Sequence, residues 1–209
     1  MSLFKKLYSI LPFKLLLFSV IKKFVELPYT VYRHLHFIGV FTIQNSHKGA
    51  FSLKHYGAGY TMESDFFWKG FGGFEKISCL TWERLSLNSQ TVIDIGANTG
   101  IYSLITSSCN PKAIVYAFEP SNRVFTKLSE NNTLNNFSIK TINLAVAEES
   151  KTMTYYDNAS ENPYTGSLVN NTKQNQTNSI QVNTVSPVSY THLRAHETKA
   201  NLVCRLLLE

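Results

Sequence analysis

Cysteine is scarce in this sequence. The 209 residues include three cysteines, Cys79, Cys109 and Cys204, at irregular spacing. A small disulfide-stabilised scaffold needs a denser, paired set, and a zinc knuckle needs closely spaced pairs. The cysteine content therefore argues against both classes and predicts no metal site. It is typical of a reducing compartment, so we expect a cytoplasmic protein.

Long apolar runs are also missing. The most apolar window, LPFKLLLFSVIKKF, is interrupted by Lys14, Lys22 and Lys23. A helix that spans a bilayer needs roughly 20 predominantly apolar residues, so the sequence predicts no spanning helix. Lys14 also breaks the apolar core that a secretory signal peptide would need.

Acidic side chains are scarce in one part of the chain. Residues 1–45 hold six lysines and arginines against Glu26 alone, whereas residues 46–186 hold eleven basic and eleven acidic side chains. We interpret residues 1–45 as a basic amphipathic helical arm that covers the following domain. The alternative is peripheral contact with an anionic membrane surface. The apolar positions of the expected helix recur three and four residues apart: Leu16, Leu17, Val20, Ile21 and Phe24.

The remaining sequence is rich enough in apolar residues to form a core, because 44% of the chain is hydrophobic. Its last part, residues 187–209, resembles translated sequencing adapter, so we expect a non-native tail and a native sequence that stops near Ser186. Residues 46–90 are expected to form a lead-in subdomain. Residues 91–186 are expected to form the N-terminal half of a cofactor-binding domain.

From Thr91 the pattern alternates between short apolar runs and segments of helical period. The runs are TVIDI, AIVYAF and IKTINLAV, and a helix is expected over residues 121–132 between the last two. Short continuous apolar runs are typical of strands that are buried on both faces of a sheet. This order predicts an α/β fold with a doubly wound sheet.

The first apolar run ends in a turn that is typical of sites for nucleoside cofactors. Asp94 lies near the end of the strand, and Gly96, Asn98 and Gly100 lead into a helix. Small residues at such a turn let the backbone approach a ligand closely. Glu119 ends the second strand, where a carboxylate can accept hydrogen bonds from both hydroxyls of a ribose.

The pattern has three interpretations: a site for a nicotinamide dinucleotide, a site for S-adenosylmethionine, or a tight turn that binds no ligand. A dinucleotide site needs GxGxxG for its pyrophosphate, whereas the spacing here is GxxxG and Asp94 would repel phosphates. S-adenosylmethionine carries an ammonium and a sulfonium group where the dinucleotide carries phosphates. The electrostatics therefore favour S-adenosylmethionine over a nicotinamide dinucleotide.

Three segments resemble the FkbM family of S-adenosylmethionine-dependent methyltransferases: VIDIGANTGIYSL, VYAFEPSNRVFTKLSEN and INLAVAEESKTMTYY. The resemblance implies a class I, Rossmann-like methyltransferase fold, of which the C-terminal half is missing here. It implies that Glu119 binds the ribose and that Ala145 and Val146 lie by the adenine. It also implies that four residues form the cofactor turn: Asp94, Gly96, Asn98 and Gly100.

The activity implied by the resemblance is methyl transfer (EC 2.1.1.-), with oxygen of a small molecule or a saccharide as the acceptor. We expect the fragment to be inactive, because the family's next strand, with its acidic residue, should follow Ser186. The sequence identifies no catalytic base. Nucleic acid is not an expected partner, because residues 46–186 lack net positive charge. The alternative function is a noncatalytic nucleotide-binding or membrane-associated interaction protein on the same fold.

Overall fold

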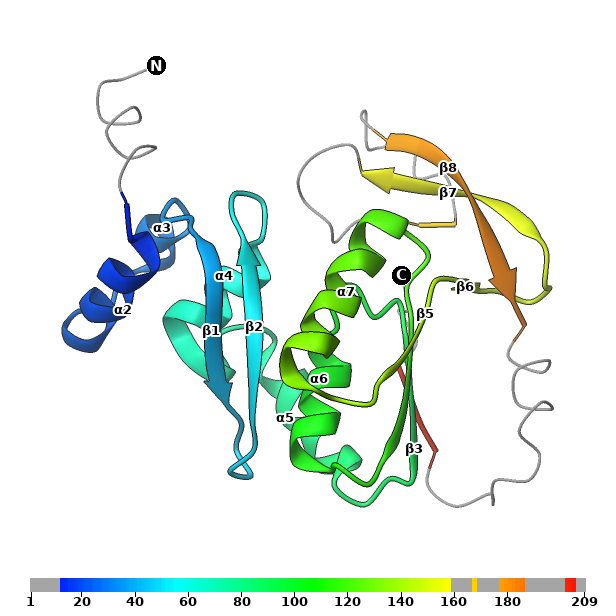
Figure 1. Cartoon of the computed structure of the whole chain (residues 1–209), viewed down its shortest axis with the longest axis horizontal. Coiled ribbons are helices and arrows are strands. Elements are labelled where there is room, and N and C mark those ends of the chain that lie inside the picture. The colour runs from blue at the N-terminus through cyan, green and yellow to red at the C-terminus, as the bar shows by residue number, and fades with distance from the viewer. Residues whose placement is uncertain (1–11, 159–166, 169–176, 187–201, 206–209) are drawn as a thin grey trace.

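The computed structural model describes residues 12–158, 167–168, 177–186 and 202–205, and Figure 1 shows how they are arranged. Two short N-terminal helices lie against an antiparallel hairpin. A parallel sheet with its helices follows, and a two-stranded ribbon lies beyond the sheet. Within the described residues, no helix is long and apolar enough to cross a bilayer.

The N-terminal part combines helices with a hairpin that the sequence pattern revealed only in part. Helices α2 (Lys14–Phe24) and α3 (Tyr29–Tyr32) precede strands β1 (Ile38–Gln44) and β2 (Ala50–Tyr56), which pair antiparallel. The run FSLKHY of β2 alternates between buried and half-buried residues, but β1 falls in the segment interpreted as a helical arm. The hairpin therefore crosses the expected boundary between residues 45 and 46.

Helix α2 forms where the amphipathic pattern predicts it, but its buried face is not the predicted one. Phe18 is buried, and Leu15 and Ile21 pack against the core. Gly39 of β1 makes room for this face, because a Cβ atom there would lie 2.8 Å from Cδ2 of Leu15. Four of the five predicted apolar positions are instead exposed: Leu16, Leu17, Val20 and Phe24.

Two further helices lead to the central sheet. Helix α4 (Thr61–Lys69), which the sequence pattern did not indicate, is followed by the 3-10 turn η1 (Gly70–Gly72) and by α5 (Lys76–Ser86). Ile77 of α5 is 81% exposed although it is apolar. The side of α5 that packs inward carries Cys79, Trp82, Glu83 and Ser86.

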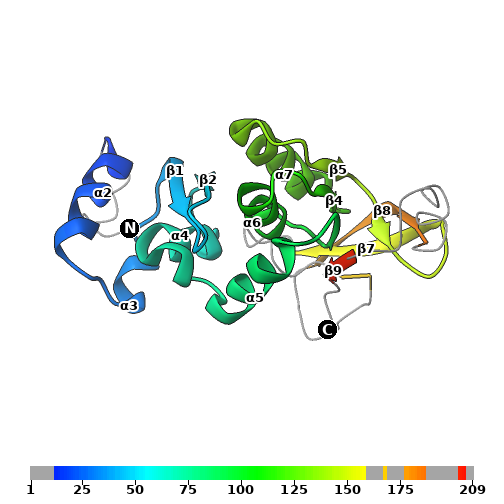
Figure 2. The ribbon, with the colours of Figure 1, turned by 90° about the horizontal axis from the view of Figure 1, so that it is seen from below.

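The central sheet confirms the predicted α/β fold class. Strands β3 (Thr91–Ile95), β4 (Ile114–Phe118) and β5 (Lys140–Ile142) are parallel and adjacent in the order β5-β4-β3. Helices α6 (Ile101–Cys109) and α7 (Asn122–Asn135) connect them. Right-handed connections that move in one direction across a sheet place both helices on the same face, and Figure 2 shows α6 and α7 together on one side.

The free side of β3 is not an open edge. Strand β9 (Leu202–Arg205) pairs with it in parallel, with Thr91 opposite Leu202 and Asp94 opposite Arg205. Strand β3 therefore has a neighbour on both sides, β4 and β9. The other residues of 187–209 lie outside the described part of the chain, and the adapter origin of this segment stays a prediction.

Three further strands form a small second sheet. Strands β6 (Ala145–Val146), β7 (Thr152–Asn158) and β8 (Thr177–Val185) are arranged in the order β6-β8-β7. The single strand expected for IKTINLAV is therefore split into β5 and β6. Side chains connect β7 to the start of α7, because Ser121 Oγ and Arg123 Nη2 donate to the carboxylate of Asp157 at 2.9 and 3.1 Å.

Candidate functional site

The turn between β3 and α6 has a backbone that only certain residues adopt easily. Gly96, Asn98 and Gly100 have φ values of +68°, +53° and +96°, in the left-handed region that glycine and asparagine tolerate best. A Cβ atom at Gly100 would also lie 2.6 Å from Cδ1 of Leu128 on α7. The turn is thus both tightly wound and packed closely against α7.

Glu119 lies next to this turn, as the sequence predicts. Its Oε2 accepts a hydrogen bond from the Asn98 backbone N–H at 3.0 Å, and its Oε1 accepts one from the Ser121 N–H at 2.9 Å. The backbone supports the same contact, because the Ala97 N–H donates to the Phe118 carbonyl at 2.8 Å. The structure therefore brings the turn and the strand-end carboxylate together.

Burial changes the protonation of Glu119. The side chain is 4% exposed, and this burial raises the pKa of Glu119 to about 7, against the opposing effect of the N–H donors of Ser121 and Asn98. The nearby Asp157 and Asp94 also raise the pKa. The carboxyl group therefore ionises near neutral pH. Below that pH it is protonated and can donate a hydrogen bond, and above it the carboxylate only accepts them.

The raised pKa predicts a pH dependence of stability that Glu119→Gln removes. The unfolded state ionises this carboxyl near its ordinary pKa of 4.5, whereas the folded state retains the proton up to about 7. As pH rises between these values, ionisation favours the unfolded chain, and the contribution of Glu119 to the free energy of unfolding falls by about 3 kcal/mol. Urea unfolding at about pH 5 and about pH 8 measures this contribution as the difference between parent and variant. An identical difference at both pH values would contradict the raised pKa.

The carboxylate of Asp94 is hydrogen-bonded to the helix that follows the turn. The residue is fully buried, and its Oδ2 accepts hydrogen bonds from the backbone N–H and the hydroxyl of Ser103 at 3.2 and 2.7 Å. Ser103 lies in the first turn of α6. A buried carboxylate therefore already occupies the N-terminal end of α6, where a phosphate would otherwise bind.

The segment after β5 reaches the site through a residue that the sequence analysis missed. Asn143 donates its side-chain N–H to the carbonyls of Glu119 and Pro120 at 2.8 and 3.2 Å. Ala145 and Val146, the predicted neighbours of the adenine, form β6 and pair with β8. Asn143 lies between Ile142 and Leu144, and a polar side chain between two apolar ones is the signal that could have identified it.

Helices α4 and α7 also form hydrogen bonds with the turn. The hydroxyl of Thr99 donates to Oε1 of Glu63 at 2.9 Å, and the side chain of Asn131 on α7 donates to the Thr99 carbonyl at 2.9 Å. All three residues are fully buried. Because Glu63 lies 36 residues before Thr99, no local pattern in the sequence connects the two.

We expect Thr99→Val to destabilise the protein by about 1–3 kcal/mol. The valine side chain has the shape of threonine but cannot donate to Glu63, and loss of a partner for a buried polar group costs energy of this size. Urea unfolding measures the effect. The matched control is Thr126→Val on the exposed side of α7, where the hydroxyl donates only to the Asn122 carbonyl, and we expect less than about 0.5 kcal/mol there. Equal effects of the two substitutions would refute a special role for Thr99.

A buried serine and histidine pair has the wrong hydrogen bonds for nucleophilic catalysis. His55 and Ser64 are buried, and Nε2 of His55 lies 2.8 Å from Oγ of Ser64. Nδ1 of His55 accepts the Gly57 backbone N–H at 3.1 Å, so the ring proton lies on Nε2 and is donated to Ser64. A general base would need to accept from the serine. Burial also lowers the pKa of His55 to about 4, so the pair is a neutral part of the core.

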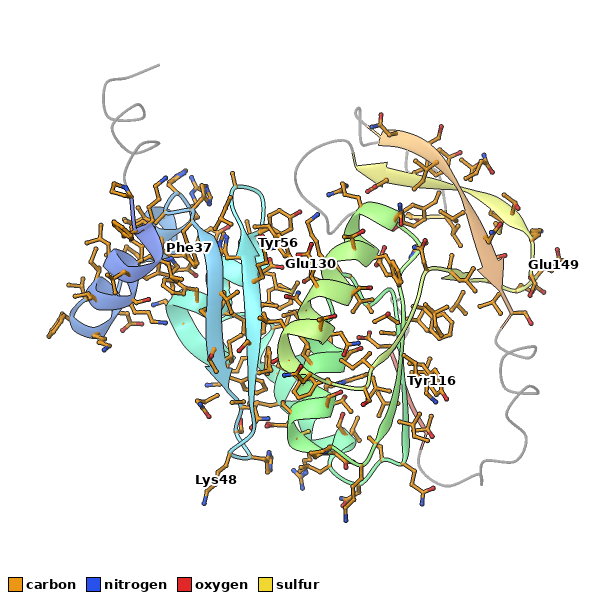
Figure 3. All side chains as sticks on the ribbon, viewed as in Figure 1. Phe37, Lys48, Tyr56, Tyr116, Glu130 and Glu149 are labelled. Atoms are coloured by element: carbon orange, nitrogen blue, oxygen red, sulfur yellow. The ribbon has the colours of Figure 1, made fainter. Side chains whose placement is uncertain are left out.

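A groove of about 720 Å³ lies between the hairpin and α7, away from the β3–α6 turn. Its lining includes Val40, Lys54, Phe125 and Glu130 and neither the turn residues nor Glu119. Figure 3 shows Tyr56 of β2 and Glu130 of α7 facing each other across this region, where the Tyr56 hydroxyl donates to Glu130 at 3.1 Å. The groove is therefore distinct from the predicted site.

Comparison with solved structures gives distant similarities. A SAM-dependent methyltransferase from Agrobacterium tumefaciens matches with 14% identity and a TM-score of 0.35, over 51% of this chain and 32% of that chain. M. jannaschii TYW2 in complex with AdoMet matches with 18% identity and a TM-score of 0.30, over 51% of this chain and 42% of that one. The chain thus spans less than half the length of either structure. No curated protein matches the sequence at a significant level.

Comparison with family models gives a match that includes the candidate site. The matching model is the methyltransferase FkbM domain, over residues 94–200. This range is about half of the chain, and it begins at Asp94 and includes the turn, Glu119 and Asn143. The chain therefore belongs to the FkbM methyltransferase family.

Proposed function

We propose that this chain binds S-adenosylmethionine at the β3–α6 turn and belongs to an enzyme that methylates a hydroxyl oxygen of a small molecule or a saccharide. The observation that supports the proposal most strongly is the hydrogen bond between Glu119 and the turn, within the region that matches the FkbM family. The oxygen acceptor follows from the family resemblance.

The charges around the turn fit this cofactor better than a dinucleotide. The Asp94 carboxylate already accepts the Ser103 N–H at the start of α6, so a pyrophosphate there would meet a buried negative charge of its own sign. S-adenosylmethionine presents an ammonium, a sulfonium and two ribose hydroxyls instead. Each of these groups is compatible with carboxylates at the ends of β3 and β4.

Glu119 has the chemistry needed to hold a ribose. Each of its oxygens accepts one backbone N–H, and a carboxylate oxygen has a second lone pair for a further donor. The backbone of the turn positions the carboxylate, and Gly96 places no side chain between the backbone and a ligand. When bound, S-adenosylmethionine supplies an electrophilic methyl group, and positioning of the acceptor provides most of the acceleration.

The acceptor side of the reaction is not assigned to residues of this chain. A binding experiment therefore tests the proposal more directly than an assay of methyl transfer.

Isothermal titration of the full chain with S-adenosylmethionine, S-adenosylhomocysteine and NAD⁺ tests the proposal. We expect one site for the two adenosyl compounds and no detectable binding of NAD⁺. The two adenosyl compounds share the ribose that Glu119 would hold, whereas NAD⁺ carries the pyrophosphate that Asp94 disfavours. Binding of NAD⁺ in preference to S-adenosylmethionine would overturn the proposal, and binding of none of the three would support a noncatalytic interaction protein.

A further inference from the structure

The outer side of α2 is apolar and exposed. Phe13 and Phe24 are 80% and 81% exposed, and Leu16 is 66% exposed. Monomeric proteins expose single apolar side chains commonly but contiguous apolar patches rarely. We define the outer face of α2 as the apolar residues that recur at helical spacing along its exposed side: Phe13, Leu16, Leu17, Val20 and Phe24.

The orientation of this outer face is fixed by contacts on the opposite side of the helix. The ring of Phe18 packs edge-on against the ring of Phe37, and its centre lies 5.6 Å from the centre of the Trp68 ring. Lys22 donates to the Phe67 carbonyl at 3.0 Å, and its ammonium lies 4.1 Å from the centre of the Phe67 ring. Figure 1 shows α2 at the outer end of the molecule, beyond the hairpin. The side of α2 opposite the outer face therefore packs against the core, and the outer face contacts no other part of the described chain closely enough to be buried.

The charges near the outer face have one sign. Residues 12–25 contain Lys14, Lys22 and Lys23 and no acidic residue. The nearest acidic residue in sequence, Glu26, is paired with Lys69 at 2.6 Å. A second copy of the chain placed symmetrically on this face would bring lysines of α2 against their own counterparts, and like charges at an interface cost free energy. An anionic surface has the opposite effect, because it attracts these lysines.

We propose that the outer face of α2 docks the protein on an anionic lipid surface, with the helix lying in the plane of the interface. An apolar helical face flanked by lysines is the pattern that inserts into the boundary between headgroups and acyl chains. Phe13 and Phe24 stand at the two ends of this face, and Lys14 and Lys23 neighbour them. The described helices are too short to span a bilayer, so the contact is peripheral. This inference does not depend on the methyltransferase proposal.

Sedimentation with vesicles tests the inference on the full chain. The parent is expected to sediment with vesicles of phosphatidylcholine and phosphatidylglycerol and much less with phosphatidylcholine alone. Leu16→Ser/Phe24→Ser is expected to reduce the partition coefficient by more than about tenfold, since two apolar side chains are lost from the interface. Lys14→Gln/Lys23→Gln is expected to reduce it by about fivefold per lysine on the anionic vesicles only.

The matched control is Ile77→Ser/Leu85→Ser, which changes two side chains of α5 that are 81% and 52% exposed. We expect this variant to partition like the parent. An equal loss in the control would show that any exposed apolar residue supports binding, and it would overturn the proposal. The proposal would also fail if the parent did not bind either vesicle, or if sedimentation velocity showed a dimer that Leu16→Ser/Phe24→Ser dissociates.

Discussion

Glu119→Ala is expected to weaken the binding of S-adenosylmethionine about 100-fold or more at about pH 8. At this pH the carboxyl, whose pKa is raised to about 7, is ionised. The substitution removes the acceptor for both ribose hydroxyls, and hydrogen bonds to a charged group are the stronger kind. It also removes the partner of the Asn98 backbone N–H, which positions the turn. Isothermal titration of parent and variant measures the effect.

Two comparisons separate this effect from a general loss of structure. Glu149→Ala removes a carboxylate that is fully exposed and paired with Lys151, and we expect unchanged affinity. Glu119→Gln retains the size of the side chain but not its charge, so its affinity is expected to stay constant with pH. The affinity of the parent is expected to fall as pH drops through about 7, because Glu119 is then protonated. A Glu119→Ala variant that is folded and binds like the parent would remove Glu119 from the site.

Gly100→Ala is expected to lower the free energy of unfolding by about 2–4 kcal/mol. The residue has a φ of +96°, where a side chain is strained, and the new Cβ would lie 2.6 Å from Cδ1 of Leu128. Leu128 is 1% exposed, so it has little space into which it can move. Urea unfolding measures the loss, and titration with S-adenosylmethionine is expected to show weaker binding because the turn moves.

Gly72→Ala is the matched control for this substitution. Its added Cβ would meet only the side chain of Lys76, at 3.5 Å or more, and Gly72 has no positive φ. We expect a change within about 0.5 kcal/mol. If Gly100→Ala and Gly72→Ala had the same free energy of unfolding, this would contradict the close packing of the turn against α7.

The sequence predicted the turn and its partner because both follow from local patterns. The strand that ends near Asp94, the glycines after it and the carboxylate at Glu119 are each readable within a few residues. Parallel strands that are adjacent in a sheet bring their carboxyl ends to one edge. The proximity of Asn98 and Glu119 could therefore be inferred, whereas the burial of Asp94 against Ser103 could not.

The helical faces were predicted less well, because hydrophobicity alone does not decide which side of a helix packs. In α2 the side that packs inward includes Phe18, and Lys22 donates to the Phe67 carbonyl, while Leu16 faces outward. In α5 the buried side includes Glu83 and Ser86, while Ile77 is exposed. The space left by Gly39 and the hydrogen bonds of Trp82 to α6 select these faces. Such contacts join residues far apart in the sequence.

Residues that support the site through long-range contacts were also beyond sequence analysis. Glu63 contacts Thr99 from a helix that no clear pattern indicated, and Asp157 reaches Ser121 from β7. Buried acidic side chains are uncommon, yet their burial becomes visible only once the fold is known. The sequence therefore predicted the turn and Glu119, but not the residues that form hydrogen bonds with them from distant parts of the chain.

A crystal structure of the full chain with S-adenosylmethionine tests the central claim most directly. The account predicts that the ribose hydroxyls lie about 2.5–3.0 Å from the carboxylate oxygens of Glu119, with the methionine part along the Gly96–Gly100 turn. S-adenosylmethionine bound away from this turn would contradict the account. A structure from crystals soaked with a dinucleotide that showed its pyrophosphate on the first turn of α6 would contradict it as well.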